Sequence, residues 1–131
     1  MERFSLTTRQ REELLPLTAK LQDIIANNGW QHGILLVYSP HTTAGLTLNE
    51  SADPDVRRDI CSFMAGLVPR HAGFKHMEGN SDAHLKTSLF SPHCLLIVEN
   101  GSLQLGQWQH VYFCEWDGPR QREVWLQFLP S

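Results

Sequence analysis

The sequence predicts an α+β fold built on a mostly antiparallel sheet. About seven segments of strand type and three of helix type follow one another without the regular strand–helix alternation that a parallel sheet requires. The chain has 131 residues, which is the length of one domain, and we place that domain at residues 1–131. A domain of this size buries roughly two thirds of the surface of its unfolded chain, so its fold needs no disulfide or metal.

The expected strands are segments of alternating apolar and polar residues, or short apolar runs between turn residues. Residues 34–38 are almost wholly apolar, which predicts a strand buried on both faces. Pro16 places the segment 13–17 at a sheet edge, because proline cannot donate a hydrogen bond to a neighbouring strand. Asn100-Gly101 and Asp117-Gly118-Pro119 are turn sequences. The other expected strands are residues 4–8, 46–48, 95–99, 108–116 and 124–129.

Three segments carry helix signals. Thr18 is the expected N-cap of a helix that ends at Asn27-Asn28-Gly29. Asp53-Pro54 supplies an N-cap and a first-position proline for the clearest amphipathic helix. Its apolar stripe is predicted to pack against the sheet and consists of Val56, Ile60, Phe63, Met64 and Leu67. Ser81 is the expected N-cap of a short third helix.

The composition argues against several classes of function. The formal net charge is −3 and the basic residues are scattered, so nucleic acid is not an expected partner. No apolar run approaches membrane-spanning length, and Met1 is followed by charged Glu2-Arg3, so we expect neither a membrane protein nor a signal peptide. The three cysteines form no CxxC pair, and an odd count argues against a disulfide framework. These observations together favour a reduced, cytoplasmic compartment.

Three histidines stand where a metal site can form. His41 follows directly after the strand at 34–38, while His76 and His84 flank the helix start at 79–82. Neutral imidazole is the commonest zinc ligand, and three protein ligands with one open position are the usual catalytic arrangement. We therefore expect the three imidazoles to converge on one divalent ion. The alternative is two surface histidines and one histidine hydrogen-bonded at a strand end.

Arg120 is the second candidate for chemistry. It follows a Gly-Pro turn, and its planar fork suits a carboxylate or phosphate of a small anionic substrate. The alternatives are a solvated arginine on a plain turn, or an ion pair with Asp117 or Glu115.

Carboxylates and polar side chains near these motifs complete the candidate site. Glu50 and Asp117 are candidate catalytic bases, and Glu115 is a further carboxylate that can orient a histidine. Glu50 can instead pair near Arg57. The side chains expected to hydrogen-bond a substrate are Thr42, Asn49 and Asn80.

Four sequence blocks resemble, in order, those of the YjbQ-like family of secondary thiamine-phosphate synthases. They are residues 41–50 (HTTAGLTLNE, continued by DPDV at 53–56), 79–86 (GNSDAHLK), 101–109 (GSLQLGQWQ) and 115–122 (EWDGPRQR). The resemblance implies a pseudo-barrel or sandwich of strands, a homotrimer, and a histidine-lined, metal-binding site onto which His41, His76 and His84 map. Zinc is the expected ion, with magnesium as the alternative for a diphosphate substrate.

The activity implied by the resemblance is a transferase reaction. Hydroxymethylpyrimidine diphosphate is joined to thiazole phosphate, and pyrophosphate is released. Two other functions stay open at this point: a metal-dependent hydrolase of a small anionic substrate, and a non-catalytic trimeric protein that binds a metal. The chain has neither a glycine-rich phosphate loop nor an Asp-Asp-x-x-Asp magnesium motif, which weakens mechanisms based on these motifs alone.

Overall fold

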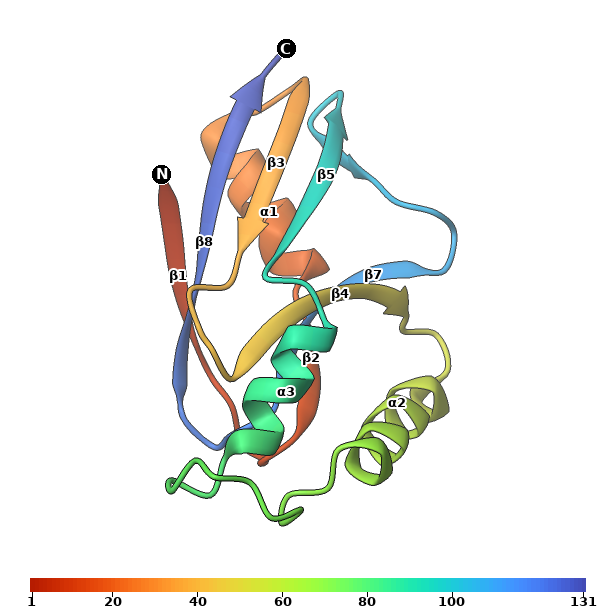
Figure 1. Cartoon of the computed structure of the whole chain (residues 1–131). Helices are drawn as coiled ribbons and strands as arrows, with labels where there is room; N and C mark the ends of the chain where they lie inside the picture. The colour runs from red at the N-terminus through yellow and green to blue at the C-terminus, as the bar shows by residue number, and fades with distance from the viewer.

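The computed structural model describes residues 1–131 and contains two antiparallel sheets and three helices, as Figure 1 shows. The larger sheet has the strand order β1-β8-β3-β5-β6, and the smaller sheet has the order β2-β7-β4. The strands of the larger sheet are β1 (Glu2–Thr7), β3 (Gly33–Tyr38), β5 (His93–Glu99), β6 (Ser102–Gln104) and β8 (Gln121–Pro130). Those of the smaller sheet are β2 (Glu13–Pro16), β4 (Ala44–Glu50) and β7 (Gln109–Glu115). The predicted α+β class and antiparallel pairing are confirmed.

The helices divide between two positions. Helix α1 (Thr18–Asn28) buries Leu21 and Ile25 in the main core, whereas α2 (Pro54–Leu67) and α3 (Ser81–Leu89) adjoin the smaller sheet. In Figure 1 the larger sheet and α1 lie above, and α2 and α3 lie below. No helix combines the length and apolar character needed to cross a membrane.

Two hydrophobic clusters follow from this layering. The first contains 14 buried residues from both sheets and α1. The second contains 7, and there Tyr112, Cys114 and Trp116 meet Met64 of α2 and Ala83 of α3. The smaller sheet is therefore covered on both faces, while the larger sheet buries only one.

Strand β3 differs from the prediction that both its faces are buried. Leu35 and Val37 are fully buried, but Ile34 and Tyr38 are exposed on the opposite face. The strand lies between β8 and β5 in an antiparallel sheet, and no helix of the chain covers the outer face. Its apolar run reflects an uncovered apolar surface and not a strand buried inside one chain.

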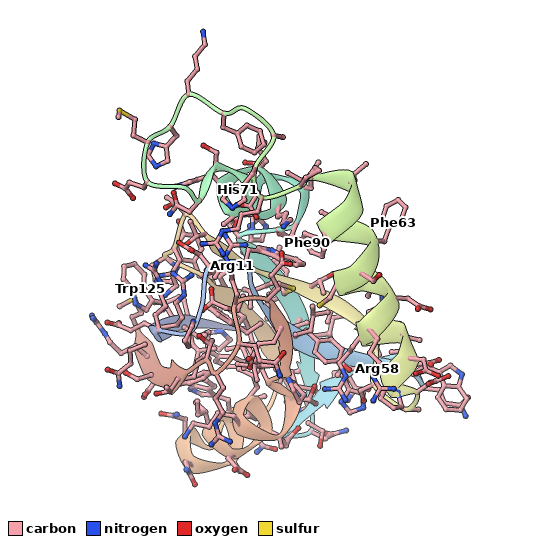
Figure 2. All side chains as sticks on the ribbon, turned by 90° about the horizontal axis from the view of Figure 1, so that it is seen from below. Arg11, Arg58, Phe63, His71, Phe90 and Trp125 are labelled. Carbon is pink, nitrogen blue, oxygen red and sulfur yellow. The ribbon has the colours of Figure 1, made fainter.

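Helix α2 begins as predicted but packs less than predicted. The Asp53 side chain accepts a hydrogen bond from the Asp55 backbone N–H at 2.9 Å, with Pro54 in the first turn. Only Met64 of the expected stripe is buried, and Phe63, at 67 % exposure, points away from the sheet in Figure 2. The smaller sheet has three strands and is shared with α3, so the stripe extends beyond the surface available to it.

The other two N-caps were predicted one residue too late. Leu17 precedes α1, and the Thr18 hydroxyl instead accepts a hydrogen bond from the Val111 backbone N–H of β7 at 3.0 Å. Asn80, not Ser81, occupies the N-cap of α3. The Thr18 side chain binds β7 and the Asn80 side chain binds Asp117 of the β7–β8 turn, so neither side chain caps its helix.

Candidate functional site

The turn between β7 and β8 meets the start of α3 through three polar side chains. Asp117 Oδ2 accepts hydrogen bonds from Asn80 Nδ2 and from Arg120 Nη2, both at 2.9 Å. Arg120 Nε also donates to the Asp117 carbonyl oxygen at 3.0 Å. The ion pair that the sequence left as an alternative for Arg120 is therefore present. The Arg120 side chain is still 50 % exposed, so the free edge of its guanidinium can bind an anion.

His76 and His84 lie together beside this turn. Their ring centroids are 5.3 Å apart and the rings meet edge to face. His84 lies one helical turn after Asn80 in α3. Asn80 in turn is hydrogen-bonded to Asp117 of the Asp117–Arg120 pair. His76 is 44 % exposed, with Nε2 3.7 Å from Glu78 Oε2. It borders a cleft of about 290 Å³ in the loop before α3, on the side of the molecule where Figure 2 shows His71.

His41 is held elsewhere. Its Nε2 atom lies 2.9 Å from the backbone nitrogen of Glu123, which donates to it, and 3.1 Å from the carbonyl oxygen of the same residue. Burial and then the nearby Arg122 charge lower the pKa of His41 below its ordinary value of 6.5, so the ring is neutral at pH 7 and accepts the hydrogen bond. The ring also packs edge-on against Phe113. His41 is thus the histidine satisfied at a strand end.

The predicted three-histidine metal set does not assemble within one chain. No group of three or more His, Cys, Asp or Glu side chains is placed to hold a metal ion. The physical reason is that His41 Nε2 is engaged by the Glu123 backbone of β8, whereas His76 and His84 face each other at the start of α3. Two imidazoles do not fit a zinc site of three protein ligands, and further ligands would have to come from outside the chain.

Glu115 and Arg122 form a buried ion pair that sequence reasoning did not find. Arg122 Nε donates to Glu115 Oε1 at 2.9 Å, Nη2 donates to Oε2, and both side chains are almost fully buried. Thr8 donates to Glu115 Oε1 at 2.7 Å, and Thr43 accepts from Arg122 at 2.9 Å. The pair joins β7 to β8 and, through Thr43, holds the loop that carries His41 and Thr42. The Thr42 side chain is exposed and forms no hydrogen bond. The only sequence signal for the Glu115–Arg122 pair was that both residues lie in the block at 115–122.

A second buried network anchors α3. Lys86 donates to Asp82 at 2.9 Å and to Glu12 at 2.6 Å, and Arg11 makes a bidentate contact with Asp82 at 3.0 and 3.1 Å. Burial of Asp82 by itself raises its pKa, but the hydrogen bonds and charges of Arg11 and Lys86 outweigh burial and lower it to about 2. The polar residues of the second sequence block therefore fix the helix that carries His84.

Asn49 and Glu50 lie apart from the other candidates. They end β4, and the six steps from Ala44 to Glu50 span about 20 Å at 3.3 Å per residue. The Glu50 carbonyl accepts a hydrogen bond from the Tyr112 hydroxyl at 3.0 Å, and the Asn49 side chain accepts one from the Glu50 backbone N–H at 2.8 Å. Glu50 forms no ion pair with Arg57. Within one chain the predicted site is divided between the two ends of the smaller sheet.

The fold and these contacts define a class of small α+β proteins in which two antiparallel sheets carry polar clusters at the strand ends. A family model described as UPF0047 protein YjbQ-like matches residues 2–131, and the chain belongs to this family. The chain is 42 % identical over 127 residues to a UPF0047 protein of Methanocaldococcus jannaschii, covering 97 % of this chain and 92 % of that one. It is 41 % identical to YugU of Bacillus subtilis, with 98 % of each chain covered.

Solved structures have the same fold. A YjbQ/UPF0047 protein from Clostridium acetobutylicum superposes with a TM-score of 0.95 at 42 % identity, covering 98 % of this chain and 100 % of that chain. A protein from Aeropyrum pernix gives a TM-score of 0.94 at 36 % identity, covering 99 % and 98 %. The arrangement of sheets and helices is therefore that of the family.

Proposed function

We propose that the protein is a transferase of the secondary thiamine-phosphate synthase type, joining hydroxymethylpyrimidine diphosphate to thiazole phosphate. The observation that carries the proposal is the imidazole pair of His76 and His84, with ring centroids 5.3 Å apart, together with the half-exposed Arg120 side chain, which Asp117 and Asn80 connect to the start of the helix that carries His84. Groups of this kind bind anionic substrates and carry protons. The four sequence blocks of the synthase-like family supply the reaction class.

The residues of this chain have separable roles in the proposed reaction. Release of pyrophosphate develops negative charge on the leaving group, which the free edge of Arg120 stabilises. Asn80 and Asp117 fix the direction of the guanidinium, since Asp117 binds both. His76, which lines the cleft, and His84, whose ring packs against that of His76, exchange protons with substrate oxygens. No step is assigned to a metal, because one chain offers two imidazoles and not three.

A homotrimer forms part of the proposal. The outer face of the larger sheet exposes Ile34, Tyr38, Leu95, Ile97 and Leu129. These residues occupy adjacent strands β8, β3 and β5, so they form one surface and are not scattered singly. An assembly covers this apolar surface, and in the proposal a neighbouring subunit also completes the divided site.

Two substitutions test the proposed roles in a pyrophosphate-release assay with both precursors. Arg120→Lys is expected to raise KM by on the order of 10- to 100-fold, because a point charge does not replace a bidentate contact. His84→Ala is expected to lower kcat, and elemental analysis shows whether bound metal falls with it. His32→Ala is the matched control, since that exposed imidazole precedes β3 and is outside the cluster.

Three results would count against the proposal. No pyrophosphate release by the wild type, together with hydrolysis of phosphoesters, would replace it with the hydrolase alternative. Full activity in Arg120→Lys would show that Arg120 makes no bidentate contact with the substrate anion. A lower melting temperature with unchanged KM would show that Arg120 serves only its ion pair with Asp117.

A further inference from the structure

A large hollow lies away from the histidine cluster. It has a volume of about 600 Å³ and is bordered by the start of α1, the segment after β4, the first turn of α2, and the β6–β7 connection. In Figure 1 the end of β4, the start of α2 and the β6–β7 connection lie on the right-hand side, and α1 lies nearer the centre. This volume is within the usual range of pockets for small organic ligands.

Arg57 gives the hollow its charge. Its guanidinium forms no ion pair or hydrogen bond and lies over the Tyr112 ring, 6.0 Å from the centroid. The neighbouring Arg58, in contrast, pairs with Asp55 at 2.9 Å. No carboxylate lines the hollow, so its only permanent charge is positive and unneutralised. An anion is the ligand that this charge favours.

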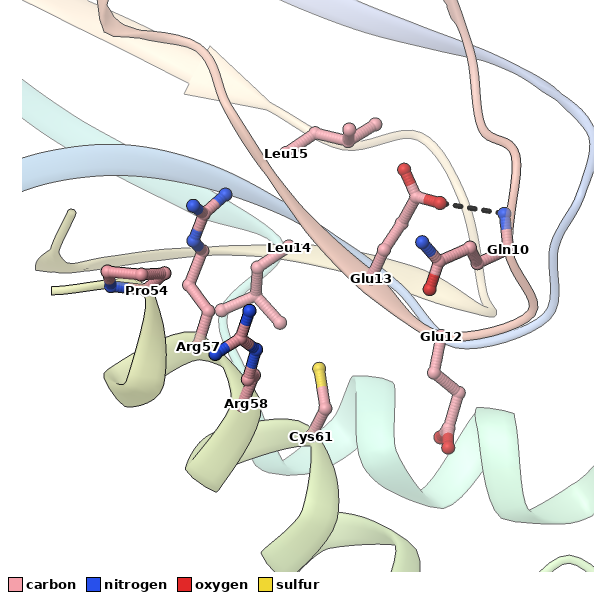
Figure 3. Close-up of a pocket in the computed structure, with 9 residues that line it drawn as sticks. All are labelled: Gln10, Glu12, Glu13, Leu14, Leu15, Pro54, Arg57, Arg58 and Cys61. Atoms are coloured by element: carbon pink, nitrogen blue, oxygen red, sulfur yellow. Dashed lines mark hydrogen bonds between the residues drawn. The ribbon is translucent and has the colours of Figure 1, made fainter.

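Arg57 also borders a second cleft, of about 370 Å³, between α2 and β2, and Figure 3 shows that cleft. Glu12, Glu13, Arg57 and Arg58 line that cleft, where Glu12 is paired with Lys86 and Arg58 with Asp55, so that Glu13 remains as the counter-charge to Arg57. The charges of that cleft are therefore balanced. We therefore expect an anion to bind Arg57 from the α1 side and not from the β2 side.

The polar and apolar walls of the larger hollow define the ligand further. Ser51 and His110 line it without any side-chain hydrogen bond to the protein, so their donors are free for a ligand. Leu103 and Leu105 supply an apolar wall. Both leucines belong to the third sequence block, residues 101–109, which the proposed function leaves without a role.

We propose that this hollow is a binding site for a small organic phosphate, held by Arg57, His110 and Ser51, with its carbon body against Leu103 and Leu105. A phosphate has three terminal oxygens, enough for an arginine fork, an imidazole and a hydroxyl at once. The site is separate from Arg120, because the five steps of β7 from His110 to Glu115 alone span about 17 Å. The proposal therefore goes beyond the proposed function and does not depend on it.

Phenyl phosphate is a suitable probe, because it joins one phosphate to one apolar ring. In a titration of the full chain followed by two-dimensional amide NMR, we expect the signals of Ser51, Leu105 and His110 to shift. Arg57→Gln should weaken this binding by on the order of 10- to 100-fold, the effect of losing a hydrogen bond to a charged group. Arg58→Gln removes the same charge one residue away and should leave the Kd nearly unchanged.

Melting temperature detects any loss of folding in Arg57→Gln, and a second variant tests the site independently. Leu105→Ser should weaken phenyl phosphate but leave inorganic phosphate unaffected, because only the former contacts the apolar wall. Equal weakening by Arg57→Gln and Arg58→Gln, or shifts confined to Asn80, Asp117 and Arg120, would overturn the proposal. If the signals of Ser51 and His110 shift but the protein has no synthase activity, the proposed phosphate site stands and only the proposed function is wrong.

Discussion

At the scale of single residues, the Glu115–Arg122 pair shows how the chain holds a charge in its interior. Both side chains are almost fully buried, so each has lost its hydration. Their remaining polar atoms are used: Thr8 donates to Glu115, Thr43 accepts from Arg122, and the Asp117 backbone N–H donates to Glu115 at 3.1 Å. The pair is stable as a network, and either charge alone would be unfavourable.

Glu115→Gln is therefore expected to destabilise the protein by about 3–5 kcal/mol, the range for leaving a buried charge without its partner. Urea unfolding of the wild type and the variant measures the difference in the free energy of unfolding. The control is Asp55→Asn, which breaks the exposed pair with Arg58 and should change stability by about 1 kcal/mol or less. Equal effects of the two substitutions would contradict the role given to burial.

Asp82 makes stability depend on pH in a defined window. Its pKa is about 2 in the folded protein and 3.8 is its ordinary value, so the unfolded chain binds more protons between these limits. The stabilisation by Asp82 is fully present above about pH 4 and is lost as the pH falls towards 2. Asp82→Asn should lower stability at pH 7, because Arg11 and Lys86 lose the carboxylate that pairs with them. It should also reduce the decrease in stability between pH 4 and 2. Unfolding curves at several pH values test this, and an unchanged slope in the variant would exclude Asp82 as its source.

At the scale of elements, the turn between β7 and β8 depends on close approach of two backbone segments. Gly118 donates its N–H to the Arg11 carbonyl at 2.9 Å, and a Cβ at this position would overlap the Gln10 carbonyl oxygen. Gly66 in α2 is the opposite case, with open space where a Cβ would stand. Substitution of glycine by alanine should therefore change the free energy of unfolding in opposite directions at Gly118 and Gly66.

Gly118→Ala is expected to lower the free energy of unfolding by about 1–3 kcal/mol, because backbone atoms must move to admit the methyl group. Gly66→Ala should raise it by about 0.5–1 kcal/mol, because alanine loses less backbone entropy in a helix. Thermal and urea unfolding of both variants provide the comparison. A stabilised Gly118→Ala would show that the contact with the Gln10 backbone does not limit the turn.

At the scale of the whole molecule, the outer face of the larger sheet is the main departure from a self-sufficient fold. Leu95 and Ile97 of β5 are 62 % and 53 % exposed, although each alternates with a fully or almost fully buried neighbour. The alternation is that of a strand with two apolar faces, of which the chain covers one. The proposed trimer gives the second face a partner.

Ile97→Asp should accordingly shift the mass in light scattering from that of a trimer towards that of a 15.0 kDa monomer at micromolar concentration. The substitution places a charge on the outer face and leaves the buried face of β5 intact. Phe63→Asp is the control, since that exposed side chain projects from α2 on another part of the surface. A monomeric wild type would end the proposal of a trimer.

The sequence alone determined the elements with local causes. Asp53-Pro54 begins α2, where the cap lies two residues from the N–H that it binds. Asn100 and Gly101 make the β5–β6 turn with positive φ angles of 50° and 73°. Turn residues directly after them, Asn100-Gly101 and Asp117-Gly118-Pro119, marked the ends of the strands β5 and β7. Each signal is complete within a few residues, because helix caps and turns depend on nearby backbone atoms.

Only the tertiary structure decided the arrangement of the candidate site. His41 binds the backbone of Glu123, which lies 82 positions further along the chain, and Arg122 contacts Thr43 over 79 positions. The location of both partners is set by pairing of β8 with β1 and β3, and no local pattern reports that register. Residues that the sequence predicted for one site were therefore separated or engaged by contacts that exist only once the sheets have formed.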